Sequence, residues 1–120
     1  MVVGISRVTL HLPGNQSLKG KRQVIRRICD RIRNRFHISV AEVGDQDMHQ
    51  RSQIAYAVIS NEQPMVESIL DQVLNAIDAL QLAPILNKES EILHFGEDMG
   101  EDPLQPNQAG SGWDYMEEWK

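Results

Sequence analysis

The sequence predicts an α+β domain whose elements follow the order strand, helix, strand, strand, helix, strand. Two stretches carry apolar residues at the spacing of an amphipathic helix, and four others alternate apolar with polar residues or concentrate β-branched residues, as strands do. The chain has 120 residues, of which 41% are hydrophobic and 24% are charged. This length and composition suit one ordinary folded domain.

The first strand and the first helix are the clearest elements. The strand is expected over 2–12, where apolar and polar residues alternate until the turn residues 13–15 stop it. Ser17 is a favourable N-cap for the helix that follows, which is expected to end near Arg35. Its apolar stripe consists of Leu18, Ile25, Ile28, Cys29, Ile32 and Phe36.

The next three elements read as a hairpin and a second helix. Strand-like runs cover 37–43 and 53–60, and the short polar connection between them favours antiparallel pairing. Pro64 suits the first turn of a helix, where its missing N–H is not needed. The buried stripe of this second helix is expected to consist of Val66, Ile69, Leu70, Val73, Ile77 and Leu80.

A last strand-like segment, 83–95, is interrupted at 87–90, and this segment is therefore expected to be bent or bulged. The complete order is the split β-α-β or ferredoxin-like arrangement, a four-stranded antiparallel sheet with two helices on one face. The other sheet face is then open, and a homodimer through the sheet or its edge is one expectation. In one register this face presents Val3, Ile5, Ala55, Ala57 and Ile59.

The chain divides into a folded part and an acidic tail. We expect a ferredoxin-like domain over 1–97 and a tail over 98–120, the first part of which has the composition of a flexible linker. Seven acids and one lysine lie between Glu97 and Lys120, so this stretch carries −6 of the net charge of −5 and residues 1–96 carry +1.

Composition also bears on the compartment. Cys29 is the only cysteine, so no internal disulfide can form and a reducing compartment is expected. The first residues lack the pattern of a signal peptide, and no segment has the apolar length of a membrane span. The sequence therefore predicts a cytoplasmic protein without a membrane role.

Basic residues concentrate on the first helix. Eight of the twelve lysines and arginines lie between residues 19 and 35, where they form two stripes that flank the apolar one. One interpretation is a cationic surface for RNA phosphates, because such contacts supply most of the affinity of nucleic-acid-binding proteins. The predicted anion- or nucleic-acid-binding residues are Ser17, Lys19, Lys21, Arg22, Arg26 and Arg33.

A structural interpretation of the same arginines is equally open. Arginine is a good helix former, and Asp30 can pair locally with Arg26 and Arg27. One basic stripe can also face an acidic stripe on the second helix, formed by Glu67, Asp71 and Asp78.

Other chemistry has weaker support in the sequence. Asp45, Asp47 and His49 have a spacing that could suggest a metal, but turn-forming aspartates explain them better, so no metal site and no cofactor are predicted. Cys29 lies on the buried stripe, and no nucleophile, base and orienting group can be assembled. Base stacking on the sheet needs exposed aromatics, and the first and third strands offer only Tyr56.

Three runs of the sequence form an ordered combination: Val8-Thr9-Leu10-His11-Leu12-Pro13, Ser17-Leu18-Lys19-Gly20-Lys21-Arg22 and Phe36-His37-Ile38-Ser39-Val40-Ala41-Glu42-Val43. Asp47 and Gln50-Arg51 before 54–60 continue it. Over residues 1 to about 96 this combination resembles the bacterial YlxP-like family, a domain-of-unknown-function family. The resemblance implies a ferredoxin-like fold. The family has no established activity, and its genes often lie near those for translation initiation and ribosome maturation proteins.

The resemblance and the basic helix together predict a non-catalytic accessory protein that associates with RNA or the ribosome. Two alternatives remain open. One is a homo-oligomeric protein-interaction module that uses the open sheet face and has no nucleic-acid role. The other is a sensor of a small anion or metabolite at the turn 17–22, where the first helix begins.

Overall fold

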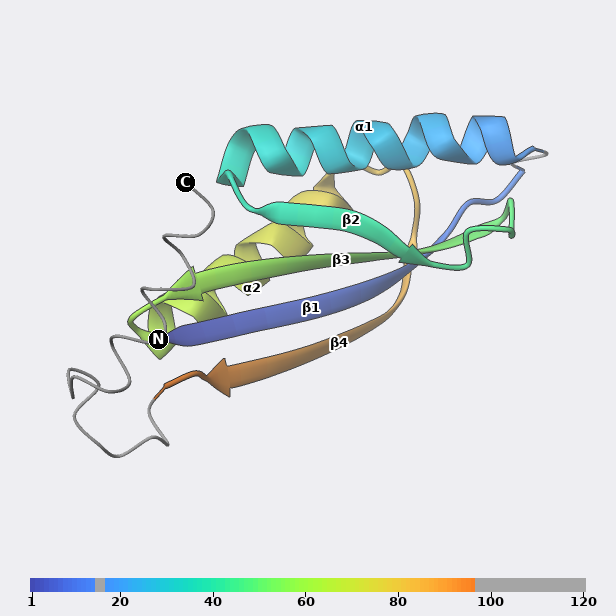
Figure 1. Cartoon of the computed structure of the whole chain (residues 1–120). Helices are drawn as coiled ribbons and strands as arrows, with labels where there is room; N and C mark the ends of the chain where they lie inside the picture. The colour runs from blue at the N-terminus through green and yellow to red at the C-terminus, as the bar shows by residue number, and fades with distance from the viewer. Residues whose placement is uncertain (15–16, 97–120) are drawn as a thin grey trace, which may run out of the picture.

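The computed structural model describes residues 1–14 and 17–96 (Figure 1). The predicted order of elements is confirmed, and the predicted tail 98–120 lies outside the described residues. Neither of the two described helices is long and apolar enough to cross a membrane. The elements are β1 (Val2–His11), α1 (Leu18–Phe36), β2 (Ser39–Gly44), β3 (Arg51–Ser60), α2 (Gln63–Ala79) and β4 (Ile85–His94).

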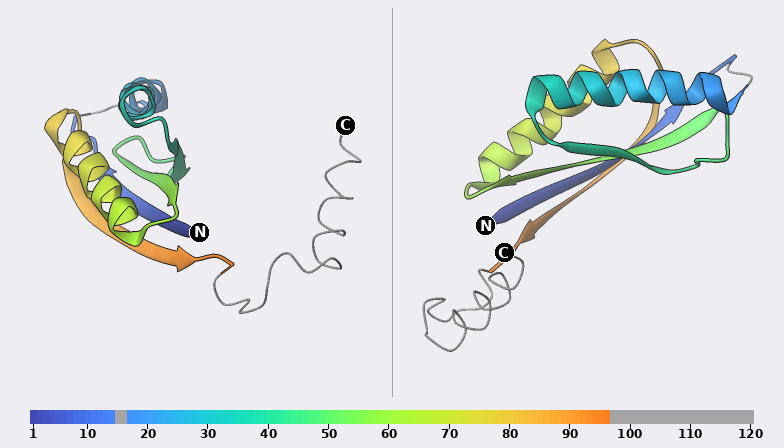
Figure 2. Two further views of the ribbon diagram at one scale, coloured as in Figure 1. Left: turned by 90° about the vertical axis from the view of Figure 1, so that its left-hand side faces the viewer. Right: turned by 45° about the horizontal axis from the view of Figure 1, so that its top comes forward.

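The four strands form one sheet in the order β2-β3-β1-β4, and every neighbouring pair is antiparallel. Both helices cover the same face of this sheet, with α1 toward the β2 edge (Figures 1 and 2). The predicted ferredoxin-like fold is therefore confirmed. The two long central strands, β1 and β3, lie beneath the helices and anchor the core.

The core forms where the inward-facing residues of the sheet meet the apolar stripes of the helices. Tyr56 and Ile54 on β3 are almost fully buried, and the Tyr56 hydroxyl donates a hydrogen bond to the Leu70 carbonyl oxygen on α2 at 3.3 Å. Burial raises the pKa of the Tyr56 phenol above its usual value. The one aromatic residue of β3 thus serves the core and is not available for base stacking.

Helix α2 comes very close to β1 at Gly4. A Cβ atom at this position would overlap Cγ1 of Val66 and would lie 2.8 Å from Cδ1 of Leu70. The absence of a side chain at Gly4 therefore sets how closely α2 packs on the sheet.

Strand β4 contains a bulge, as predicted for the segment 83–95. The register shifts between Thr9 and Leu10, whose partners on β4 are Asn87 and Ile85, so Leu86 is the extra residue of the bulge. Leu86 is 57% exposed. The polar run 87–90 pairs regularly with β1 and does not interrupt the strand.

The other element boundaries differ from the expected ones by a few residues. Phe36 ends α1 because His37 adopts the left-handed conformation of a helix cap, with φ of 55°, and β2 then begins at Ser39. Strand β3 begins at Arg51, two residues before its expected start, since Arg51 pairs with His11 on β1. Helix α2 starts at Gln63, which places Pro64 in the first turn as predicted.

The sheet face opposite the helices has the predicted register. Val3 pairs with Ile59 and Ile5 pairs with Ala57, and all four side chains point away from the helices. β4 adds Leu93 to this face. The open face is thus apolar at the end of the sheet where β1 begins.

Candidate nucleic-acid interface

The solvent-facing side of α1 is strongly basic. Ser17 caps the helix, its Oγ accepting a hydrogen bond from the Gly20 amide at 3.0 Å. Beyond the cap, basic side chains are exposed on each successive turn, and none of them forms an ion pair within the described part of the chain. They are Lys19, Arg22, Arg26, Arg27, Arg31 and Arg35.

Lys21 does not belong to this surface, and its prediction as an anion-binding residue is wrong. The residue is 0% exposed. Its ammonium donates hydrogen bonds to the carbonyl oxygens of Asp45 at 2.6 Å and Arg51 at 3.3 Å, and lies 3.1 Å from a Glu42 carboxylate oxygen. These partners within the domain neutralise the Lys21 ammonium and accept its hydrogen bonds. Lys21 therefore connects the first turns of α1 to the two ends of the β2–β3 loop.

Further hydrogen bonds and an ion pair hold Glu42 and Asp45, the acidic residues near Lys21. Ser52 donates a hydrogen bond to the same Glu42 oxygen at 2.6 Å, and Arg51 Nε lies 2.9 Å from the Asp45 carboxylate. Gln53 donates a further hydrogen bond to Asp45 at 3.2 Å. The hydrogen bond from Arg51 is the main reason that the pKa of Asp45 lies below its usual value. Asp45 is therefore occupied as a structural acceptor.

The burial of Lys21 was open to prediction from spacing alone. The residue precedes Ile25, Ile28 and Ile32 by four, seven and eleven positions, which places it in the middle of the apolar stripe. The concentration of basic residues around it hid this signal. Glu42 gave the complementary signal, because it alternates inward with Val40 on β2.

Arg33 is only partly available. One guanidinium nitrogen donates a hydrogen bond to the Val40 carbonyl oxygen at 2.6 Å, and another lies 3.2 Å from Asp30, while the side chain stays 48% exposed. Asp30 thus pairs with Arg33, and its predicted pairing with Arg26 and Arg27 is wrong. Of the predicted anion-binding residues, Lys19, Arg22 and Arg26 are exposed on the flank of α1 toward β2 and form no ion pair among the described residues.

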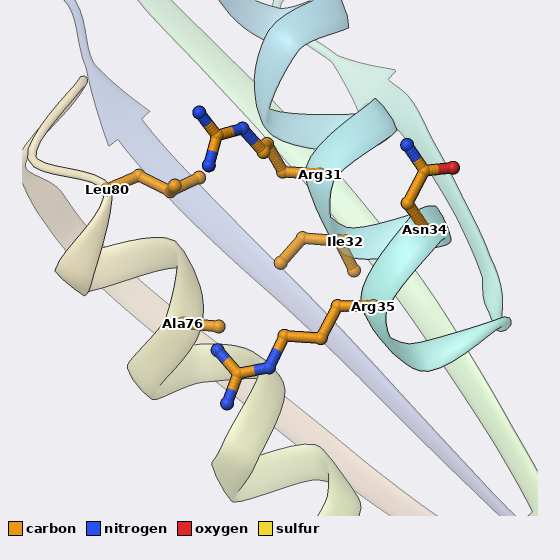
Figure 3. Close-up of a pocket in the computed structure, with 6 residues that line it drawn as sticks. All are labelled: Arg31, Ile32, Asn34, Arg35, Ala76 and Leu80. Carbon is orange, nitrogen blue, oxygen red and sulfur yellow. The ribbon is translucent and has the colours of Figure 1, made fainter.

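The flank of α1 toward α2 is also unneutralised. No ion pair joins α1 to α2 among the described residues, so the predicted match between a basic and an acidic stripe does not form. Instead a hollow of about 320 Å³ lies between the two helices (Figure 3). It is lined by Arg31, Ile32, Asn34, Arg35, Ala76 and Leu80.

The other residues considered in the sequence are the single cysteine, the possible metal ligands and the turn 17–22. Cys29 is buried on α1 as predicted, and burial raises the pKa of its thiol. In the described residues no group of three His, Cys, Asp or Glu side chains could hold a metal ion. At the turn 17–22, Ser17 acts as the helix cap and Lys21 is buried, so only Lys19 and Arg22 are left to meet an anion there.

Residues 3–90 match the pattern of the family described as "Protein of unknown function (DUF503)". The chain belongs to this family. A relative from Bacillus subtilis (strain 168), "Uncharacterized protein YlxP", is 41% identical over 63 residues, which cover 52% of this chain and 68% of the relative. The predicted resemblance to YlxP-like proteins is confirmed.

Two solved structures have some similarity to this member of the DUF503 family. A structural-genomics protein, YJCS, has a TM-score of 0.50 at 5% identity and covers 77% of this chain and 99% of its own. A putative antibiotic biosynthesis monooxygenase from Deinococcus radiodurans has a TM-score of 0.44 at 19% identity, with 81% and 94% covered. At such identities the likeness concerns the fold alone.

Proposed function

We propose that this DUF503 protein is a non-catalytic, cytoplasmic accessory protein that binds RNA, including RNA on the ribosome, through the exposed basic face of α1. One observation carries the proposal: six basic side chains are exposed along one 19-residue helix without an ion-pair partner in the described part of the chain. Such a helix is about 28 Å long. A rigid cationic surface of this length can meet several backbone phosphates at once.

The neutralised basic residues sharpen the proposed set of RNA-binding side chains. Lys21 and Arg33 have partners inside the domain. On the flank of α1 toward β2, the side chains that bind RNA phosphates are therefore Lys19, Arg22 and Arg26. The buried Cys29 thiol, with its raised pKa, is a poor nucleophile and supports the non-catalytic part of the proposal.

The proposal is tested by binding of fluorescent structured RNA and of ribosomal subunits across a salt series. The variant Arg22→Ala/Arg26→Ala is compared with the control Arg7→Ala/Lys88→Ala, which removes the same charge from exposed positions on β1 and β4. We expect the α1 variant to weaken binding and to reduce the salt slope by roughly one for each phosphate that the protein no longer neutralises. The control should keep the slope. Absent or salt-insensitive binding by the unmodified chain would defeat the proposal.

The open sheet face supports a second candidate, a homo-oligomeric interaction module without a nucleic-acid role. Ile5 is 38% exposed and Leu93 42% exposed on this face, Ile59 is 67% exposed at its end, and Phe95 follows β4 with 64% exposed. Contiguous apolar surface of this kind favours association with protein. Sedimentation over a concentration range, with Ile59→Asp as the variant, tests this. Dimerisation that the variant abolishes, together with no RNA affinity, would favour this candidate over the first.

A further inference from the structure

The hollow between α1 and α2 joins an apolar floor to two arginines that form no ion pair among the described residues. Ile32 on α1 and Ala76 on α2 are buried, and Leu80 closes the floor beyond the end of α2. The side chains of Arg31 and Arg35 extend from α1 toward α2 on either side of Ile32 (Figure 3). The result is an apolar surface between two guanidinium groups.

Ion pairing within the described residues does not explain the two arginines. They are four residues apart on one helix, where like charges repel each other. Neither forms an ion pair within the described residues, and the Arg35 guanidinium lies 5.0 Å from the centre of the Phe36 ring. A pair of planar guanidinium groups matches the geometry of phosphate oxygens.

We propose that this hollow binds one nucleotide, with its phosphate between Arg31 and Arg35 and its base against Ile32, Ala76 and Leu80. The volume of about 320 Å³ lies at the lower end of the range for small-molecule sites and suits a single nucleotide. The floor itself is aliphatic and offers a base apolar contact, while Asn34 is the one uncharged polar residue of the lining. An inorganic anion would leave the apolar floor in water and would bind less tightly.

The nucleotide has two sources, a free mononucleotide or an unpaired nucleotide of RNA. The RNA source rests on the proposed function, whereas binding of a free nucleotide depends on the hollow alone. A base inside a duplex is stacked and cannot reach the floor, so the RNA source requires a bulge, loop or end. Failure of the hollow would leave RNA binding through Lys19, Arg22 and Arg26 intact, so the two proposals can fail separately.

The test is a methyl NMR titration of the full chain with AMP, adenosine and inorganic phosphate. AMP should shift the methyl signals of Ile32, Ala76 and Leu80 in a saturable way, and should bind about tenfold more tightly than phosphate or adenosine alone. Equal affinity for AMP and phosphate, or unshifted floor methyls, would overturn the proposal.

Variants separate a built site from general attraction to a basic helix. Arg31→Ala/Arg35→Ala should weaken AMP binding about tenfold, and Arg31→Lys/Arg35→Lys should recover only part of it, since lysine lacks the planar fork. Arg22→Ala/Arg26→Ala removes the same charge outside the hollow and should leave AMP affinity unchanged. An equal loss in both alanine variants would overturn the site. All of these changes lie on the exposed side of α1, and an unchanged thermal midpoint confirms that each variant folds.

A last comparison identifies the source. An RNA hairpin with a single-nucleotide bulge is titrated beside its fully paired counterpart. Preference for the bulge, lost in Arg31→Ala/Arg35→Ala, supports the RNA source, whereas AMP binding with no such preference assigns the hollow to free nucleotides.

Discussion

The ammonium of Lys21 lies 3.1 Å from the carboxylate of Glu42, which joins the first turns of α1 to strand β2 beneath the surface. The lysine is fully buried, while the side chain of Glu42 keeps 18% of its surface exposed. Two loop carbonyl oxygens complete the lysine's hydrogen bonds, so none of its charge remains for an external partner. Lys21, the most buried basic residue of α1, therefore stabilises the fold.

Replacing Lys21 should be costly. Lys21→Met keeps the size of the side chain but leaves Glu42 and two carbonyl oxygens without their donor, and we expect a loss of about 3 kcal/mol of unfolding free energy. Urea denaturation measures the loss. Lys19→Met, an exposed neighbour on the same helix, should change stability by less than about 0.5 kcal/mol. Similar values for the two variants would contradict the internal role of Lys21.

Acid should weaken the β2–β3 loop through Asp45. Its pKa is lowered in the folded state, mainly by the hydrogen bond from Arg51, so its stabilising contribution is present above the ordinary value for aspartate, about 3.9. The contribution is lost as pH falls through the lowered folded-state pKa. We expect stability to decline less steeply in this acid range for Asp45→Asn, as measured by urea midpoints against pH. A variant with the same acid slope as the parent would exclude this role for Asp45.

Gly4 should not tolerate a side chain. Gly4→Ala places a methyl group against Val66 and Leu70, and the resulting separation of α2 from β1 should cost about 1 to 3 kcal/mol. Thermal unfolding checks this value. Val3→Ala, on the opposite face of the same strand, serves as the control and should cost less. An unchanged midpoint for Gly4→Ala would show that α2 adjusts without strain.

Cys29 should resist alkylation in the native protein. The thiol is buried and its pKa is raised, so both access and thiolate fraction are low. We expect the rate with iodoacetamide to rise at least about tenfold when denaturant unfolds the domain. A fast native reaction would reveal local opening of α1.

Removing the acidic tail should strengthen RNA binding. Residues 97–120 carry −6, and we expect this charge to compete with RNA for the basic face of α1. A chain ending at Gly96 should therefore bind RNA severalfold more tightly at low salt, and the difference should shrink as salt rises. Neutralising the seven acids in the full chain provides the control for length. If neither change alters affinity, the tail does not restrain binding.

Much of the fold followed from local patterns in the sequence. The two helical stripes and the alternation in β1 and β3 are set by which residues face the core, and this information is carried by spacing alone. The cap at Ser17 and the proline at the start of α2 are equally local. The order of the elements then indicated the ferredoxin-like arrangement, and the alternation within β1 and β3 identified the sheet face that the helices leave uncovered.

The candidate site was less predictable because it depends on contacts between distant segments. Whether an arginine is exposed or paired is decided by what lies across from it, and Arg33 finds the Val40 carbonyl only after β2 has docked. The hollow beside Arg31 is lined by residues of both helices, among them the small side chain of Ala76, so no pattern within one helix records it. The bulge at Leu86 likewise follows from pairing with β1 rather than from its own residue type.

The central position of β1 shapes how the protein can fold during its synthesis. β1 is translated first, yet Val2 pairs with Ser60 on one side and with His94 on the other. A nascent chain that has only reached the end of α2 therefore keeps one edge of β1 bare, with apolar side chains beside it. Such an edge invites pairing with other chains. Completion of β4 covers this edge and puts in its place the edge of β4, whose exposed Lys88, Glu89 and Glu91 disfavour pairing with other chains.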